Sequence, residues 1–92
     1  MIHFIVHGKQ DTVGVMVTDA GKDQKLAGWN METDETLEAV ALQDIPLGHK
    51  IAMQRIKAGD RVIKYNVPIG KAVSDIAQGE HVHTHNLRTA RW

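Results

Sequence analysis

Three copies of one short pattern constrain the fold of this chain more than any other feature. Each copy places an isoleucine, two residues, a glycine, two residues and then isoleucine or valine: "DIPLGHKI" (44–51), "RIKAGDRV" (55–62) and "DIAQGEHV" (75–82). We expect the isoleucine to enter the core, the glycine to adopt positive φ in a tight turn, and the last residue to begin a strand. The residues in these positions are Ile45, Ile56 and Ile76; Gly48, Gly59 and Gly79; and Ile51, Val62 and Val82. The pattern predicts a compact, mostly β domain of short strands with long connections.

Apolar residues at every second position predict two further strands near the start of the chain. The expected core faces are Ile2, Phe4 and Val6, then Val13, Val15 and Val17, joined by a hairpin turn at 7–11. The segment "ETLEAVALQD" (35–44) has a helix-like composition, but Leu37, Ala39 and Ala41 keep a period of two. We therefore expect a strand there too.

Length and composition bound the class of protein. A chain of 92 residues with 42% hydrophobic content predicts a single domain spanning residues 1–92, with a thin core and little room for a deep enclosed site. The absence of cysteine excludes disulfides and thiol chemistry, and it suits a cytoplasmic location. The apolar run "FIV" is too short for a signal sequence or a membrane span, so no membrane association is expected.

Charge is unevenly distributed along a chain that is neutral overall. Residues 1–47 carry eight acidic and three basic residues, whereas residues 48–92 carry three acidic and eight basic residues. Either the two halves attract each other, or the basic half faces a small anionic substrate. Nucleic acid is not expected as a partner, because aromatic residues make up only 4% of the chain and the pI is near neutral.

Histidines at every second position in "GEHVHTHNL" (79–87) form the strongest candidate site. On a strand, His81, His83 and His85 would share one face. Two neighbouring rings can converge on one metal ion, whereas the outer pair is about 13 Å apart along extended chain. We therefore expect His81 and His83 as metal ligands and His85 against the substrate, unless the strand simply presents histidines to water. Because imidazole titrates near neutrality, His83 and His85 are also the candidate catalytic residues.

Three other residues are candidate substrate contacts. His49 follows the glycine of the 44–51 copy and would approach the histidine run if the copies pack together, although a turn histidine in water is the alternative. Arg88 can hold an anion with two hydrogen bonds, and Asn86 borders the run directly. Lys50 and Lys71 are less favoured, because most lysines are solvated. The terminal pair "RW" (91–92) is a candidate anchor on a partner.

The segments "DIPLGHKIA", "AGDRVIKYNVPIGKAVSDI" and "GEHVHTHN" together resemble the SAF domain of the altronate and galactarate dehydratase family. The resemblance covers nearly the whole chain and implies a β-clip fold, a divalent metal, iron(II), and an elimination next to a carboxylate. In most relatives the domain leads into a much larger catalytic region, whereas this chain stops seven residues after His85. The resemblance thus implies a small subunit that is inactive without a large catalytic (beta) subunit, which could itself hold the general base.

Several functions remain open at this point. The favoured expectation is a two-subunit, metal-dependent lyase acting on a small anionic hydroxy acid, with release of sulfite from 3-sulfolactate to leave pyruvate. Loss of water from altronate or a related sugar acid is the second expectation, since the shared motifs do not separate the two. A non-catalytic module that binds a ligand or a protein is the third.

Overall fold

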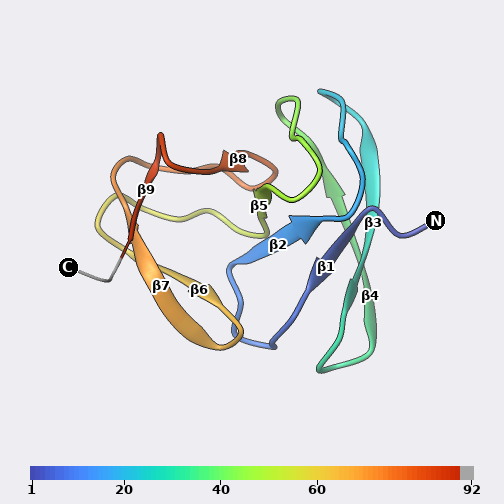
Figure 1. The fold of residues 1–92 in the computed structure, drawn as a ribbon, viewed down its shortest axis with the longest axis horizontal. Coiled ribbons are helices and arrows are strands. Elements are labelled where there is room, and N and C mark those ends of the chain that lie inside the picture. Colours follow the sequence, from blue (N-terminus) through green and yellow to red (C-terminus); the bar gives the residue numbers. More distant parts are fainter. Residues whose placement is uncertain (90–92) are drawn as a thin grey trace.

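The computed structural model describes residues 1–89, which form nine strands and no helix (Figure 1). The strands are β1 (Phe4–Val6), β2 (Val13–Met16), β3 (Lys25–Asn30), β4 (Glu35–Val40), β5 (Lys50–Ala52), β6 (Arg61–Lys64), β7 (Val67–Ala72), β8 (His81–Val82) and β9 (Leu87–Thr89). The prediction of a mostly β domain with short strands is confirmed. The candidate anchor at 91–92 lies outside the described residues. Within the described range there is also no helix long and apolar enough to cross a membrane.

The strands form two sheets. Six strands are ordered β4-β3-β1-β2-β5-β8, and three are ordered β6-β7-β9. β1 and β2 pair antiparallel, as expected of the first hairpin, and β1 pairs parallel with β3 on its other side. Each end of β2 faces a different core cluster, one containing Phe4 and Met16 and the other Val13 and Val62. The molecule therefore has two small cores, with β2 between them.

This position of β2 overturns the predicted core faces of the first hairpin in part. Val13 is buried, but Val15 is only partly buried and Val17 is 43% exposed in the bend after the strand. Met16 lies directly across from Phe4 and is buried with it. A strand with a core on each face buries residues at both odd and even positions, so buried and exposed residues do not alternate along it. Ile2 is likewise 40% exposed, ahead of β1.

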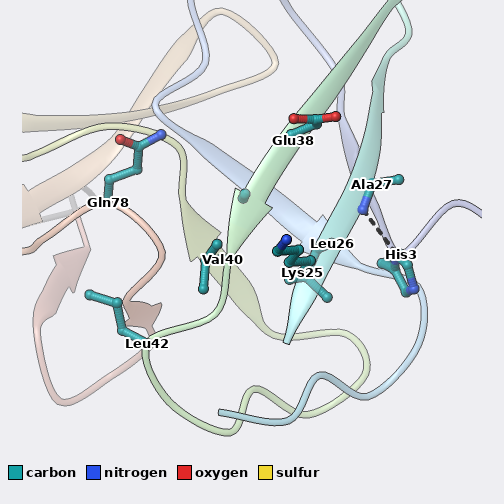
Figure 2. A pocket seen from close by; sticks show the side chains of 9 residues that line it. His3, Lys25, Leu26, Ala27, Glu38, Val40, Leu42 and Gln78 are labelled. Carbon is teal, nitrogen blue, oxygen red and sulfur yellow. Dashed lines mark hydrogen bonds between the residues drawn. The ribbon is translucent and has the colours of Figure 1, made fainter. Parts of the chain in front are cut away.

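The expected strand at 35–44 is confirmed for Glu35–Val40, which forms β4. Ala39 is buried and Leu37 packs against the same core cluster, whereas Val40 is largely exposed. At this end of the sheet, β3 and β4 border a hollow of about 670 Å³ (Figure 2). Its lining consists of His3, Lys25, Leu26, Ala27, Glu38, Ala39, Val40, Leu42 and Gln78. The histidines of the 79–87 segment do not line this hollow.

The repeated pattern behaves as predicted. Its three isoleucines have 0%, 2% and 0% of their surface exposed, and its three glycines have φ of 86°, 87° and 87°. The residues that follow, Ile51, Val62 and Val82, are fully buried, and each is the second residue of its strand, β5, β6 or β8, so these strands begin one residue earlier than predicted. In each turn the glycine N–H donates to a distant carbonyl, for example from Gly79 to Ala52 over 2.8 Å. The motif is therefore a turn that ends one connection and starts the next strand.

A fourth copy of this turn is present at 19–26, with altered residues. Ala20 takes the place of the isoleucine, Asp23 adopts the positive φ (69°) of the glycine, and Leu26 is the buried residue that follows. Its hydrogen bonds match those of the other copies, with the Asp23 N–H donating to Ala41 and the Gln24 N–H to Gly21. The internal sequence pattern does not reveal this copy, because it has neither the isoleucine nor the glycine of the other three.

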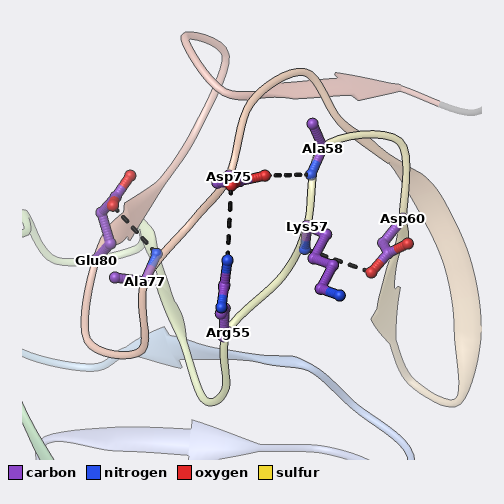
Figure 3. A network of polar contacts seen from close by, with 7 residues as sticks. All are labelled: Arg55, Lys57, Ala58, Asp60, Asp75, Ala77 and Glu80. Atoms are coloured by element: carbon purple, nitrogen blue, oxygen red, sulfur yellow. Dashed lines mark hydrogen bonds and ion pairs between the residues drawn. The ribbon is translucent and has the colours of Figure 1, made fainter.

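The four copies pack in two pairs. Ala20 bridges Ile45 and Ile56 bridges Ile76, each through two backbone hydrogen bonds of 2.7–2.9 Å. In the second pair, the Asp75 carboxylate accepts from the Ala58 N–H over 2.9 Å and lies 3.8 Å from the Arg55 guanidinium (Figure 3). The pairing fixes where each following strand begins, and hence where the histidines lie.

Candidate metal centre

The histidine cluster forms where the strands that follow two of these turns pair with each other. β5 and β8 are antiparallel neighbours, with Ile51 opposite His81 and Lys50 opposite Val82. This register brings His49, which precedes β5, next to His81 and His83. The Nδ1 atom of His49 is 2.8 Å from Nε2 of His81, and the His49 and His83 rings stack with centroids 4.0 Å apart. The structure therefore joins His49 to the two predicted metal ligands.

The donor set fits a divalent metal ion. One nitrogen from each of His49, His81 and His83 can be chosen so that all three lie within 4.8 Å of one another, and all three residues are half-buried. Two nitrogens on one ion are at most about 4.2 Å apart at a metal–nitrogen distance of about 2.1 Å, so a modest inward rotation of the rings is sufficient. One nitrogen of the His49–His81 pair must donate a proton to the other, and a metal ion would take the place of that proton. Three imidazoles also leave coordination positions open for a substrate.

The electrostatics of the cluster favour neutral imidazoles. Burial lowers the pKa of His81, and the charges of His49, His85 and His83 lower it further. Burial is also the main cause of the lowered pKa of His83, followed by the charges of His49 and Lys50. A neutral ring is the form that binds a metal ion or accepts a proton, so the lowered pKa values suit His81 and His83 to either role.

Asn86, which the sequence predicted as a substrate contact, lies beneath the cluster. Its side chain is 2% exposed. The amide Nδ2 donates to the His81 carbonyl over 2.8 Å and to Glu80 over 3.3 Å, while Oδ1 accepts from the His83 N–H over 2.9 Å. These bonds close the turn that carries His83 and His85. Asn86 is therefore a positioning residue.

Comparison with known proteins identifies the family of this chain. Residues 2–90 match the Altronate/galactarate dehydratase SAF domain family. The chain belongs to this family. It is 47% identical over 92 residues to the (2R)-sulfolactate sulfo-lyase subunit alpha of Chromohalobacter salexigens, covering 99% of this chain and 98% of that protein. It is 60% identical over 52 residues to the protein of the same name from Paracoccus pantotrophus, covering 56% of this chain and 78% of that protein. The altronate dehydratase of Bacillus subtilis is 40% identical over 89 residues, which are 97% of this chain but 17% of that protein.

In this SAF domain, the remaining candidates are not all close to the cluster. His85 is exposed, with its ring centroid 5.2 Å from that of His81. Arg88 is exposed on β9, opposite Lys71 of β7, and so belongs to the other sheet. Among residues 1–89, no hydrogen bond or ion pair links its guanidinium to the histidines. Closeness in sequence to the histidine run therefore does not make Arg88 part of the cluster.

The place of His49 could have been found from its turn. In three copies, the side chain after the positive-φ residue accepts a hydrogen bond from the backbone N–H three residues earlier: Gln24 from Gly21, Asp60 from Lys57 and Glu80 from Ala77. In the 44–51 copy the donor position is Pro46, which has no N–H. The side chain of His49 therefore has no such bond to accept, and its ring faces His81 and His83 instead.

Proposed function

We propose that this SAF domain is the small subunit of a metal-dependent lyase that releases sulfite from (2R)-3-sulfolactate and leaves pyruvate. The observation that carries the proposal is the 47% identity along 98% of a protein named as subunit alpha of such an enzyme. The altronate dehydratase match covers only 17% of its protein, so it supports a shared domain more than a shared activity.

In this proposal, His49, His81 and His83 hold the divalent ion, iron(II). When bound, the ion supplies Lewis-acid stabilisation of the negative charge that develops next to the substrate carboxylate. The three rings would hold the ion, and the Asn86 bonds to the His81 carbonyl and the His83 N–H fix the backbone that carries two of those rings. This assignment makes His49 a metal ligand, whereas the sequence analysis predicted it as a substrate contact.

The reaction that the site would serve is an elimination. A base removes the proton from C2, its electron pair forms the C2–C3 double bond, and the C3–sulfur pair departs with the sulfur as sulfite. The enol then takes up a proton at C3 and loses the proton of its C2 hydroxyl group to give pyruvate, so atoms and charge balance. His85 is exposed beside the ligands and is suited to carry a proton, whereas His83 is committed to the ion and contributes as a ligand.

A large catalytic subunit completes the site in this proposal. His49, His81 and His83 are only half-buried, and they line neither the hollow bordered by β3 and β4 nor the one beside Arg55 and Asp75, so the cluster lies open at the surface of this chain. Water must be excluded for the charge interactions to be strong, and a second protein surface over the cluster would do this. The small subunit alone is expected to show no turnover.

Dehydration of altronate or a related sugar acid is the second candidate. It is favoured by 40% identity to the altronate dehydratase of Bacillus subtilis over 97% of this chain. Both reactions remove a proton next to a carboxylate, so the same ligand set would serve either.

A tagged pull-down from the native host, assayed with both substrates, tests the proposal. A co-purifying large subunit with sulfite release from 3-sulfolactate supports it, and dehydration of altronate would replace it by the second candidate. His83→Ala should abolish turnover in the assembled complex, whereas His7→Ala, whose ring stacks on Tyr65, is the control. If no partner co-purifies and neither substrate is turned over, the lyase proposal fails and a non-catalytic binding module is the reading that remains.

A further inference from the structure

Three basic residues form a row across the three-stranded sheet. Arg61 of β6 pairs with Lys71 of β7, and Lys71 pairs with Arg88 of β9. Directly paired residues lie on the same face of a sheet, and all three side chains are exposed. Their neighbours Val62 and Ala72 are buried in the core on the opposite face. This basic row (Arg61, Lys71 and Arg88) therefore places three positive charges on adjacent strands, whose backbones are about 5 Å apart.

The basic row has no counter-ion within the described part of the chain. The one ion pair there joins Arg55 to Asp75, outside the row. Asp60 precedes Arg61 in sequence, but its carboxylate accepts a hydrogen bond from the Lys57 N–H. Like charges directly opposite each other on neighbouring strands are destabilising. The free chain therefore bears a cost that a bound anionic group would remove.

The acidic residues of the other half of the chain serve a different purpose. Five of the eight acidic side chains in residues 1–47 accept hydrogen bonds from backbone N–H groups or from the Trp29 indole: Asp11, Asp19, Glu32, Asp34 and Asp44. Figure 1 shows β6, β7 and β9 at one end of the molecule and β3 and β4 at the other. Among residues 1–89, no ion pair joins the acidic half to the basic half. The acidic half thus holds the fold, whereas the basic row is available to a partner.

The basic row begins close to the histidine cluster. Arg88 is two residues beyond Asn86, whose hydrogen bonds close the turn that carries His83, so at most about 7 Å of extended backbone separates Arg88 from that turn. Val73 is 53% exposed just beyond β7, and its N–H donates to the Asn86 carbonyl over 3.0 Å. A typical interface buries about 800 Å² on each partner. A protein surface of that size over the cluster would reach the row as well.

The shape of this face favours a protein segment over other anions. The row lines neither the hollow bordered by β3 and β4 nor the one beside Arg55 and Asp75, whereas small anions bind in concave sites. Single-stranded nucleic acid needs aromatic side chains for stacking, and Tyr65 lies at the other end of the β6–β7 hairpin. Carboxylates one turn apart on a helix are about 5–6 Å from each other, close to the strand spacing of the row.

We propose that the basic row is the docking site for an acidic segment of the large catalytic subunit, placed so that the same subunit covers the histidine cluster. This inference rests on the proposed function and adds to it the surface of this chain that binds the partner and the charge of the partner's segment. Arg88 then acts in assembly of the complex and not as a substrate contact.

Reversal of the central charge tests the docking site. The affinity of the tagged chain for the co-purified large subunit is measured by biolayer interferometry from about 0.05 to 0.5 M NaCl. Lys71→Glu should weaken binding by roughly 10- to 100-fold at low salt, and the difference should shrink at high salt because exposed charges are screened. Lys25→Glu makes the same charge change at an exposed lysine of β3 and should alter the affinity by less than about twofold.

The stability of the free variant separates docking from a folding defect. In Lys71→Glu the new carboxylate lies between Arg61 and Arg88, so repulsion across the strands is replaced by attraction. The urea midpoint of the free chain should therefore stay the same or rise while the affinity for the large subunit falls. A merely structural role of Lys71 would lower both.

A zero-length carbodiimide cross-link identifies the segment that the row contacts. The reagent joins a lysine amine to a carboxylate that touches it, so mass spectrometry should find Lys71 linked to an aspartate or glutamate of the large subunit. Lys71→Arg keeps the charge and should keep the affinity, but it should lose this cross-link.

Several results would overturn the inference: an unchanged affinity of Lys71→Glu, a cross-link from Lys71 to a second copy of this chain, or a partner that nuclease treatment releases. Absence of any co-purifying protein would overturn it together with the proposed function. Sulfite release from 3-sulfolactate by the wild-type complex reports on the proposed function separately. A complex whose assembly depends on Lys71 but which releases no sulfite would keep the docking site and discard the reaction.

Discussion

Gly79→Ala provides the sharpest test of the turn that precedes the histidine run, because the chain contains its own controls. Gly48, Gly59 and Gly79 have the same φ within about one degree. A Cβ atom at Gly48 or Gly59 would meet nothing within 4 Å, whereas one at Gly79 would lie 2.1 Å from the Val40 carbonyl oxygen. The three alanine variants thus share one backbone penalty and differ in one contact.

The backbone penalty and the contact with the Val40 carbonyl lower the unfolding free energy by different amounts. Left-handed backbone costs an alanine about 1–2 kcal/mol, offset by about 0.4–1 kcal/mol from the reduced entropy of the unfolded chain, so Gly48→Ala and Gly59→Ala should lose about 1 kcal/mol. At Gly79 the Val40 carbonyl must also move by about 1 Å, and forcing a tight site apart typically costs a further 1–3 kcal/mol. Gly79→Ala should therefore lose about 3 kcal/mol of unfolding free energy.

Urea unfolding of the metal-free chain measures this difference. With an m-value of about 1–1.5 kcal/mol/M for a domain of this size, the Gly79→Ala midpoint should lie about 1.5–2 M below those of the other two variants. Midpoints that agree within about 0.3 M would show that the 79–82 turn does not press against β4, and the close approach to Val40 would be refuted.

Three further predictions concern the cluster and the turns. His49→Ala should weaken zinc or iron(II) binding by at least about tenfold, whereas His85→Ala should change it by less than about threefold; equal losses in competition titrations would exclude the three-histidine ligand set. Since the pKa values of His81 and His83 are lowered in the folded chain, the unfolded chain takes up more protons below about pH 6.5. The unfolding free energy of the metal-free chain should therefore fall from pH 7 to pH 5, and the His81→Gln/His83→Gln double variant should show a smaller fall, measured by urea unfolding at each pH. Asp23→Gly should raise the unfolding free energy by up to about 1 kcal/mol, because glycine adopts its φ of 69° without strain; a loss of stability would mean that the Asp23 side chain is needed.

The turns were predictable from sequence because their demands are local. An isoleucine that fills the core and a glycine with positive φ are requirements of a few consecutive residues, so repetition in Ile45, Ile56 and Ile76 was a sufficient signal. The same reasoning failed at Asp23, since aspartate tolerates left-handed backbone without being diagnostic of it. It also failed at Val17, because β2 ends at Met16 and Val17 lies in the exposed bend that follows.

The candidate site was less predictable because it depends on strand pairing between distant segments. His81 and His83 could be grouped by spacing, but the approach of His49 results from the antiparallel register of β5 and β8, 30 residues apart. Arg88 shows the opposite case: only two residues separate it from His85, yet β9 pairs with β7 in the other sheet.

The 44–51 turn carries a histidine where the other three copies carry a turn-closing glutamine, aspartate or glutamate, and a pair of substitutions tests the role of Pro46 in this difference. His49→Glu alone should gain no turn bond, because Pro46 offers no N–H; Pro46→Ala alone should expose an N–H that His49 does not use. Together they should recreate the bond seen from Ala77 to Glu80, so that the double variant is more stable than the sum of the single changes by about 0.5–1 kcal/mol. Additivity within about 0.3 kcal/mol in urea unfolding would show that proline does not release the histidine. The stabilised double variant should also lose metal binding, because the turn bond and the metal require different side chains at the same position.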